Sequence, residues 1–276
     1  ATGTIVQMAA VQGLLGVPYS YLRSTVHGSQ EGTMGKLSEK IAMVTGASQG
    51  IGKAICHAFG QAGAALVINA RNAEKLSQAK SELAKWGVPV LMVAGDISQP
   101  ETVERVFNGL NSEFGQLDVL VNNAGAFDGG PIDELSLESW DRVINTNLRG
   151  PFLCTQRAMR LMKPKGTGRI INIGSISAQR VRPRSAPYST SKFGLVGLTH
   201  VTALEGREHG ITCGCLHPGN VLSERRVESG KPQDDEPMMT VDELAEVALL
   251  MATLPSHVAM LDAVVLPRDQ AYIGRG

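Results

Sequence analysis

The sequence predicts one doubly wound α/β domain with a seven-stranded parallel sheet. From Lys40 onward, apolar runs of strand length alternate with longer segments that have a helical pattern. The first apolar run leads into a glycine-rich turn, and a helical pattern follows the turn at once. The length of 276 residues suits one such domain with a short extension.

Composition excludes several other classes of protein. Lys and Arg together number 26, as do Asp and Glu, so the formal net charge is zero. This balance supplies no general field for polyanions, and no basic run with interleaved aromatic residues predicts nucleic-acid binding.

The cysteines predict neither a disulfide framework nor a metal site. They are Cys56, Cys154, Cys213 and Cys215, and only the last two are close in sequence. Both fall within residues 211–216, an apolar run that we interpret as a buried strand, so core thiols are favoured over metal ligands. Free thiols agree with a reducing, cytoplasmic compartment.

Residues 1–35 are predicted to be an extension and residues 36–276 the domain. Residues 1–30 contain no acidic residue and one arginine. This composition fits a targeting presequence, a weakly ordered arm, or upstream sequence fused to a domain that begins near Met34, and we favour the latter two. Glycines and Pro18 interrupt the apolar run of residues 5–22, which argues against a membrane span.

The first strand, turn and helix form a predicted dinucleotide site. Residues 41–44 are the strand, and residues 53–62 have the helical pattern. Between them, Gly46 permits a tight turn, Gly50 lets the backbone approach a pyrophosphate, and Gly52 lets the helix pack closely on the strand. The N–H groups that begin the helix are suited to bind phosphate.

The second strand, residues 65–69, indicates which cofactor is bound. It is followed by Ala70 and Arg71 rather than by an acid that would bind both ribose hydroxyls. Because an arginine after a small neutral residue suits a 2'-phosphate, we predict NADP in preference to NAD. The alternative is that Arg71 is only a solvated residue before the helix of residues 73–86.

Two further strands complete the predicted nucleotide half. Residues 89–93 precede Asp96 and Ile97, and the Asp96 carboxylate is placed to accept a hydrogen bond from an adenine amino group, although Asp is also a common turn residue. After a helix of residues 100–114, the strand of residues 117–121 ends in the small-residue stretch 122–125, against which a cofactor could lie.

A tyrosine and a lysine form a candidate proton site. Tyr188 and Lys192 lie one turn apart at the start of a predicted helix of residues 186–209, so they project from the same face. A free phenol has a pKa of about 10, and a nearby ammonium favours the phenolate. The Ser175 hydroxyl could hold a substrate oxygen while the proton of Tyr188 moves. A Tyr–Lys pair also occurs by chance on many helices.

Five motifs together resemble the classical short-chain dehydrogenases/reductases. They are TGASQGIG at residues 45–52, NNAG at 122–125, INIGS ending at Ser175, YSTSK at 188–192 and HPG at 217–219. The resemblance covers about residues 35–223 and implies a Rossmann-like oxidoreductase. It implies that Tyr188 is the general acid/base, Ser175 orients the substrate oxygen, and Lys192 binds the nicotinamide ribose and assists Tyr188. Asn147 would kink a long helix and hold a water in a proton relay.

The same resemblance implies a set of cofactor contacts. They are Gly46, Ser48, Gln49, Gly50, Ile51 and Gly52 in the turn, Arg71 at the ribose, Asp96 and Ile97 at the adenine, Asn123, Ala124 and Gly125 on the adenosine side, Tyr188 and Lys192, and Pro218, Gly219, Val221 and Ser223 near the carboxamide. Gln49 departs from the basic residue that NADP-dependent members often have in the turn. The tail after residue 266 also lacks the family's usual glycine-rich ending.

The second half is predicted to select the substrate. Residues 135–163 read as one long helix with a break at Gly150-Pro151, and the resemblance implies that this helix and residues 186–209 pack in a homodimer or homotetramer. The loop 178–187 and a lid of residues 223–240 are the candidate specificity elements. Their cations are Arg180, Arg182, Arg184, Arg225, Arg226 and Lys231, which either receive an anionic substrate or are solvated, the latter reading being favoured.

The end of the domain follows from local signals. Residues 241–253 form a predicted helix with a capping box made by Thr240 and Glu243, and residues 261–266 form the last strand. His217 is expected to pack beside the cofactor and not to act as a base.

The resulting prediction is an NADP-dependent oxidoreductase that transfers hydride between nicotinamide and a carbonyl or secondary alcohol. A 3-oxoacyl-[acyl-carrier-protein] reductase is the enzyme alternative. A catalytically silent NADP-binding sensor or scaffold is the alternative from another class, and the intact set Asn147, Ser175, Tyr188 and Lys192 argues against it.

Overall fold

The computed structural model describes residues 35–224, 227 and 237–272. The predicted extension lies outside the described residues except for Gly35, and so do the lid cations Arg225, Arg226 and Lys231.

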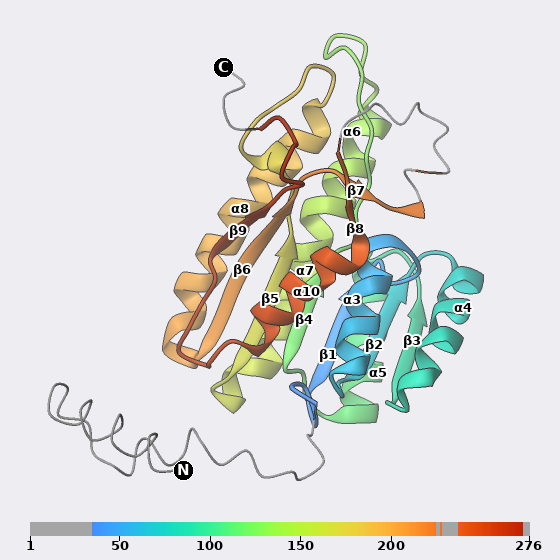
Figure 1. The fold of residues 1–276 in the computed structure, drawn as a ribbon, viewed down its shortest axis with the longest axis vertical. Helices are drawn as coiled ribbons and strands as arrows, with labels where there is room; N and C mark the ends of the chain where they lie inside the picture. The colour runs from blue at the N-terminus through green and yellow to red at the C-terminus, as the bar shows by residue number, and fades with distance from the viewer. Residues whose placement is uncertain (1–34, 225–226, 228–236, 273–276) are drawn as a thin grey trace, which may run out of the picture. The chain divides into compact units, whose positions relative to one another are not determined.

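Seven parallel strands form the main sheet, as predicted. Their spatial order is β3-β2-β1-β4-β5-β6-β9 (Figure 1). Their bounds are β1 Ile41–Thr45, β2 Ala65–Ala70, β3 Val90–Ala94, β4 Val119–Asn122, β5 Gly168–Ile173, β6 Ile211–Pro218 and β9 Asp262–Val265. The chain adds β2 and β3 on one side of β1 and the later strands on its other side. This reversal of strand order predicts a crevice at the carboxyl ends of β1 and β4.

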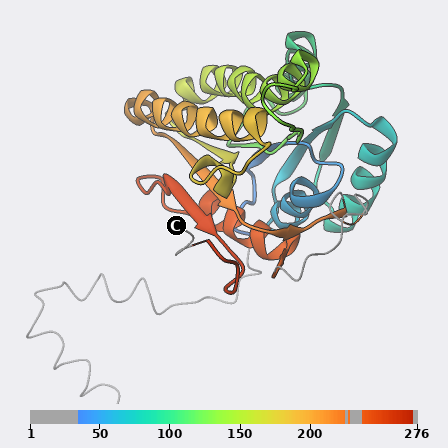
Figure 2. The same ribbon diagram turned by 90° about the horizontal axis from the view of Figure 1, so that it is seen from above.

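Helices cover both faces of the sheet (Figures 1 and 2). One face carries α3 (Gly50–Gln61), α4 (Ala73–Leu83) and α10 (Val241–Thr253), and the other carries α5 (Pro100–Phe114), α7 (Gly150–Met162) and α8 (Ala186–Gly206). Strand β1 shows why two cores form. Ala42 and Val44 belong to the first core, whereas Ile41 and Met43 belong to the second, because alternate residues of a strand face opposite sides.

Shorter elements connect these layers. They are α6 (Leu137–Ile144), the π-helical η2 (Asn145–Arg149), the 3-10 helices η1 (Ala84–Trp86), η3 (Lys163–Lys165), η4 (Ile176–Ala178) and η5 (Arg207–His209), and the two-stranded sheet of β7 (Val221–Leu222) and β8 (Met239–Thr240).

Helix ends with strong local signals agree with the predictions. Helices α5 and α10 have the predicted bounds. At α10, the Thr240 hydroxyl accepts a hydrogen bond from the Glu243 N–H at 3.2 Å, and the Glu243 carboxylate accepts one from the Thr240 N–H at 2.7 Å. The predicted capping box is therefore confirmed.

The predicted break in the long helix lies in the wrong place. Rather than breaking at Gly150-Pro151, the helix widens into a π turn over Asn145–Arg149, and α7 then begins regularly at Gly150. Pro151 has no N–H to donate to the Asn147 carbonyl four residues earlier, and the wider turn accommodates this loss.

The cysteines are core thiols, as predicted. All four are free and buried. Burial raises the pKa of each thiol, that of Cys215 to about 12, so these groups are poor nucleophiles at neutral pH. Among the described residues, no group of three or more His, Cys, Asp or Glu side chains could hold a metal ion.

In the part of the chain that the structure describes, no helix is both long and apolar enough to cross a bilayer.

Candidate active site

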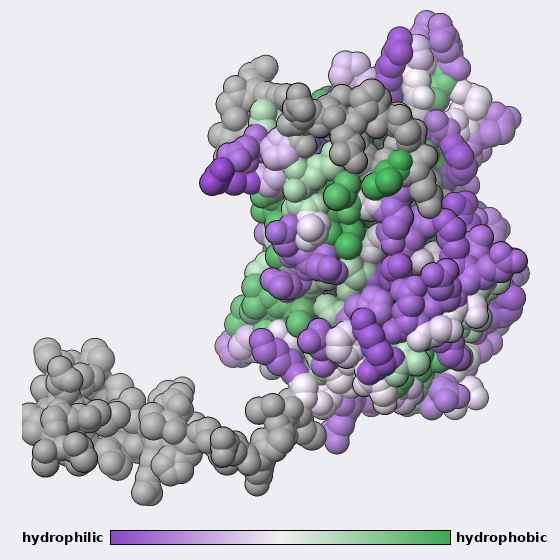
Figure 3. Space-filling model, turned by 45° about the vertical axis from the view of Figure 1, so that its right-hand side comes forward, coloured by the Kyte–Doolittle hydropathy of each residue, from purple (hydrophilic) through white to green (hydrophobic). Residues whose placement is uncertain are grey.

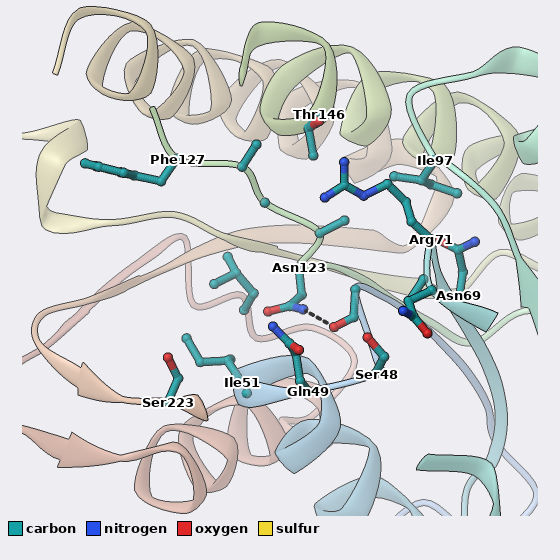
Figure 4. Close-up of a pocket in the computed structure, with 18 of the residues that line it drawn as sticks. Ser48, Gln49, Ile51, Asn69, Arg71, Ile97, Asn123, Phe127, Thr146 and Ser223 are labelled. Carbon is teal, nitrogen blue, oxygen red and sulfur yellow. Dashed lines mark hydrogen bonds between the residues drawn. The ribbon is translucent and has the colours of Figure 1, made fainter. Parts of the chain in front are cut away.

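A cavity of about 460 Å³ lies at the carboxyl ends of the central strands, where the sheet topology predicts a crevice (Figure 4). Of the residues predicted to contact the cofactor, it brings together Gly46, Ser48, Gln49, Gly50, Ile51, Arg71, Asp96, Ile97, Asn123, Ala124, Gly125, Tyr188, Lys192, Pro218 and Ser223. These residues come from six separate stretches of the chain, so their convergence is a property of the fold.

The glycine turn is held tightly against the end of β4. Gly46 has a φ of 66°, and an added Cβ there would lie 2.8 Å from the Cα of Ala124. An added Cβ at Gly52 would lie 2.3 Å from the Asn123 amide nitrogen. That amide donates to the Thr45 carbonyl at 2.9 Å and to the Gly46 carbonyl at 3.1 Å, the second of which is marked in Figure 4. Gly52 thus does not line the cavity but permits the packing that shapes it.

Cations lie at the β2 end of this cavity. Arg71 extends from the end of β2 into the cavity (Figure 4). Lys75, on the first turn of α4, also lines it, and its ammonium donates to the Gln49 side-chain oxygen at 3.2 Å. The ammonium therefore lies beside the turn position where the sequence has Gln49 instead of a basic residue. Asp96 accepts a hydrogen bond from the Ser98 N–H at 2.9 Å, which occupies one of its oxygens.

A carboxylate from a distant part of the chain lies at the start of α3. Gln49 makes no side-chain hydrogen bond as the N-cap, and the Gly50 N–H donates to Glu224 at 2.7 Å. Glu224 also pairs with Lys53 at 3.2 Å. Burial opposes the charge of Glu224, but hydrogen bonds from backbone N–H groups and Lys53 outweigh it and lower the pKa of this carboxyl. An ionised group thus lies where a phosphate would bind.

Glu224→Gln is expected to tighten NADPH binding. It removes a negative charge beside the predicted pyrophosphate position, so the dissociation constant should fall roughly threefold to tenfold, which corresponds to about 1 kcal/mol. Fluorescence titration measures this constant. Glu82→Gln is the matched control, because Glu82 also pairs with Lys53, at 3.5 Å, but does not bond Gly50. Equal effects of the two variants, or weaker binding by Glu224→Gln, would contradict this account.

The candidate proton site is at the start of α8. The Lys192 side chain is 5% exposed, and its ammonium lies 5.7 Å from the centroid of the Tyr188 ring. The ammonium donates to the Ile173 carbonyl at 2.7 Å, which fixes it at the end of β5. The Tyr188 ring packs edge-on against Phe127 at 5.0 Å between centroids. Tyr188 and Lys192 therefore share one face of α8, as their spacing predicts.

A second cavity, of about 270 Å³, adjoins the first at Tyr188. Its lining includes Ser175, Gly219 and Val221, which do not line the first cavity, while Tyr188 and Phe127 line both. The Ser175 hydroxyl oxygen accepts from the Ser177 N–H at 3.1 Å, and its own proton remains for another acceptor. Ser175 and Tyr188 thus face one space.

Asn147 lies beneath the site rather than in either cavity. Its side chain accepts from the Ala126 N–H at 2.7 Å and donates to the Ala126 carbonyl at 2.9 Å and to the Ser191 hydroxyl at 3.0 Å. It is 1% exposed. Asn147 therefore connects the π turn, the segment after β4 and the Tyr188–Lys192 turn of α8.

The three arginines of the predicted specificity loop, residues 178–187, do not all lie at the same cavity. Arg182 lines the second cavity and, together with Arg184, a separate surface pocket, whereas Arg180 lies over the ring of Tyr272 at 5.3 Å. The Tyr272 hydroxyl bonds Gln179. One of these three arginines therefore faces the space shared by Ser175 and Tyr188.

Sequence reasoning missed several lining residues. Lys75 could have been found, because it lies in the first turn of the predicted helix 73–86, shortly after Arg71. Phe127 and Thr146 carry no local signal. Glu224 could not have been placed, since its bond to Gly50 joins residues 174 positions apart. His217 lines neither cavity: its ring is fully buried against Asp262 and against Gly174, which lines the first cavity, and its place beside a cofactor stays a prediction.

Comparison with known proteins gives consistent similarities. The family model of the short chain dehydrogenases matches residues 40–234. A (2S)-[(R)-hydroxy(phenyl)methyl]succinyl-CoA dehydrogenase subunit of Thauera aromatica is 39% identical over 183 residues, which are 66% of this chain and 73% of the relative. A 3-oxoacyl-[acyl-carrier-protein] reductase of Synechocystis is 34% identical over 192 residues, 69% and 78% of the two chains.

A solved structure of the same kind of protein is also similar to this chain. A metagenomic short-chain oxidoreductase in complex with NADP is 33% identical and has a TM-score of 0.75, over 84% of this chain and 98% of that chain.

Proposed function

The chain belongs to the short-chain dehydrogenase/reductase family, and we propose that it transfers hydride between NADP(H) and a carbonyl or secondary alcohol. The family establishes an oxidoreductase that acts on CH–OH or C=O groups.

One observation carries it. Tyr188 lines both the nucleotide-sized cavity and the smaller one that contains Ser175, so its phenol lies where the two spaces meet. A proton donor at this junction could act on a carbonyl oxygen held in the second cavity while its carbon faces a nicotinamide in the first. The walls of both cavities thus support one reaction centre.

The chain's residues have distinct roles in this proposal. Ser175 donates its hydroxyl proton to the substrate oxygen and so orients it. Tyr188 gives a proton to that oxygen in reduction and takes it back in oxidation. The Lys192 ammonium, held by the Ile173 carbonyl, stabilises the phenolate that remains. Asn147 holds the turn of α8 that carries both groups.

The first cavity fits a dinucleotide. An added Cβ at Gly46 or Gly52 would press on the end of β4, and Gln49 gives α3 no side-chain cap, as suits a phosphate ligand that displaces Glu224 from the Gly50 N–H. Arg71 and Lys75 supply two cations at the β2 end, which supports a 2'-phosphate. Bound NADPH would supply the hydride, and carbonyl reduction is the direction proposed.

Arg71→Asp is expected to reverse the cofactor preference. The change removes a charge-assisted contact to the 2'-phosphate and introduces repulsion, so kcat/KM with NADPH should fall about ten- to a hundredfold, while that with NADH should rise. Steady-state kinetics with both cofactors measure the ratio. Lys80→Gln, a cation removed from the exposed side of α4, is the control and should leave the ratio unchanged. A retained NADPH preference in Arg71→Asp would refute the assignment.

A 3-oxoacyl-[acyl-carrier-protein] reductase is the second enzyme candidate. Arg182 at the second cavity favours it, because the carrier's phosphopantetheine is anionic. If this candidate is right, neutralising Arg180, Arg182 and Arg184 together should abolish acyl reduction yet spare small neutral ketones.

Assembly and location stay predictions. Large apolar side chains on α7 and α8, namely Phe152, Phe193, Val201 and Leu204, are 47 to 60% exposed and support a homodimer or homotetramer. Figure 3 shows a further view of the surface, in which apolar and polar areas are segregated. Light scattering on the purified protein measures the assembly. A cytoplasmic location and the division into an extension and a domain at residue 35 are proposed alongside it.

A further inference from the structure

A buried glutamine near the end of the chain contacts the segment that separates the two cavities. Gln270 lies beyond the end of β9, and its side chain is 8% exposed. Its amide oxygen accepts a hydrogen bond from the Asn220 N–H at 2.8 Å, a contact between residues 50 positions apart. Gln270 belongs to the tail that lacks the family's usual glycine-rich ending, and a glycine has no side chain that could make this bond.

The contacted segment, residues 218–221, contributes to the walls of both cavities. Pro218 lines the first cavity, and the three residues after it line the second. The second cavity also contains Ser175 and Tyr188. A displacement of this segment would therefore change how a nicotinamide in the first cavity faces a carbonyl in the second, and hydride transfer is sensitive to shifts of about 1 Å.

Two backbone hydrogen bonds fix Gln270 relative to β6. Strand β9 pairs in parallel with β6 as far as Pro218 and Val265, and the Gly219 N–H then donates to the Val265 carbonyl at 2.8 Å. Beyond the carboxyl end of β9 (Figure 1), the Gln270 N–H donates to the Pro267 carbonyl at 3.0 Å and closes a turn. The Gln270 side chain thus prolongs the ladder between β6 and β9 by one bond, with an amide oxygen in place of a backbone carbonyl.

The Gln270 side chain fills a space that a glycine leaves open. An added Cβ at Gly219 would lie 2.2 Å from Gln270 Oε1 and 2.7 Å from Leu266 Cδ2. On the other side of the segment, the Asn220 carbonyl accepts from the Met239 N–H at 3.0 Å, where β7 and β8 begin to pair. Asn220 is therefore held through both of its backbone groups, by Gln270 at one and by β8 at the other.

We propose that Gln270 is a positioning residue, whose amide oxygen fixes residues 219 and 220 and so sets the geometry between the two cavities. This role rests on the proposed function, because that geometry matters only if the protein transfers hydride. Gln270 thereby contributes to the reaction centre although it lines neither cavity.

Two substitutions separate the hydrogen bond from packing. Gln270→Glu keeps an oxygen that accepts from the Asn220 N–H in either protonation state, whereas Gln270→Met fills the space with only a weak acceptor. We expect kcat within about threefold of wild type in the first variant and roughly five- to fiftyfold lower in the second, with the dissociation constant of NADPH within about threefold in both. If Gln270 served only as packing, methionine would preserve kcat at least as well as glutamate, and this order would overturn the proposal.

Asp269→Asn is the matched control. Asp269 is the residue before Gln270, and it pairs with its exposed neighbour Arg268 at 2.9 Å. Its substitution should leave kcat within about twofold of wild type. A loss of kcat equal to that of Gln270→Met would show that any change in this tail lowers turnover and would overturn the specific role of the amide oxygen.

Product stereochemistry gives a readout that a loss of stability alone does not move. The variants reduce a prochiral ketone, chosen from those that the wild type reduces most selectively, and chiral chromatography measures the ratio of the two alcohols. We expect this ratio to fall at least about threefold in Gln270→Met and to stay within about twofold in Gln270→Glu and in Asp269→Asn. A ratio that Gln270→Met leaves unchanged would overturn the proposal.

The contact itself is measured without turnover, by NMR of amide hydrogen exchange. We expect the Asn220 N–H to exchange at least about tenfold faster in Gln270→Met than in the wild type and at a rate near that of the wild type in Gln270→Glu. The Cys215 N–H, which donates to the Leu261 carbonyl at 2.8 Å at the other end of the same ladder, is the internal control for global stability. Exchange at Asn220 that does not depend on residue 270 would contradict the contact.

The readouts distinguish the failures. Turnover that depends on Tyr188, combined with a kcat and an Asn220 exchange rate that Gln270→Met leaves unchanged, overturns the positioning role and leaves the proposed function standing. Asn220 exchange that depends on Gln270, in a protein that turns over no carbonyl or alcohol, overturns the proposed function and, with it, the role of Gln270.

Discussion

Tyr188→Phe should reduce kcat for carbonyl reduction about a hundred- to ten-thousandfold, the range for loss of a general acid. The substitution removes the phenol oxygen alone. The ring remains to pack against Phe127, which it meets edge-on at 5.0 Å, so neither cavity should collapse. The dissociation constant of NADPH should therefore change little. Single-turnover kinetics and a binding titration separate the two quantities.

The matched control for this prediction is Tyr272→Phe. Tyr272 is the other described tyrosine, and its hydroxyl bonds Gln179 in the loop before α8. Removing that hydroxyl should change kcat by no more than a few-fold. If Tyr188→Phe retained turnover near the wild-type level, the phenol would not be the proton donor, however well it is placed.

Lys192→Met should reduce kcat about a hundredfold or more and also weaken NADPH binding. Methionine keeps an unbranched apolar side chain at this buried position but supplies no charge to stabilise the phenolate of Tyr188 and no donor for a ribose hydroxyl. The Ile173 carbonyl would lose its partner, which costs about 1–3 kcal/mol of stability if it stays buried. Kinetics, calorimetric titration with NADPH and thermal unfolding measure the three effects.

Lys165→Met is the matched control for Lys192→Met, because it removes a lysine that has only structural partners. Lys165 donates to Gln116 and pairs with Asp118 at 3.2 Å, and these residues lie before the amino end of β4, away from both cavities. Its loss should lower stability and leave kcat unchanged. A Lys192→Met variant that behaved in the same way would place Lys192 among structural residues.

How far the sequence specifies this molecule depends on the range of each signal. Helices α5 and α10 have the predicted bounds because their signals are local: Pro100 begins the first and Gly115 follows it, and the Thr240–Glu243 box begins the second. Strand ends were less accurate. Strands β2, β4 and β6 continue past their predicted ends to Ala70, Asn122 and Pro218, because an apolar run does not show where pairing with the neighbouring strand ends.

The site was predicted in so far as its residues lie in continuous motifs. The glycine turn and the Tyr188–Lys192 pair fall in the predicted places because each is contained within one strand–helix junction or one helical turn. Contacts between distant segments were not predicted. The Glu224 carboxylate at Gly50 and the Asp262 carboxylate at His217 depend on how loops and edge strands close over the sheet, which periodicity does not specify.

One reaction centre, formed where the two cavities meet, should reduce carbonyls with NADPH. The most direct test of this activity is the oxidation of NADPH and of NADH by the wild-type protein across a panel of ketones, aldehydes and 3-oxoacyl thioesters, with the alcohol product quantified. We expect NADPH to be consumed in a one-to-one ratio with the alcohol formed, and faster than NADH. Tight binding of NADPH without turnover of any carbonyl, or of any alcohol in the reverse direction, would contradict the account.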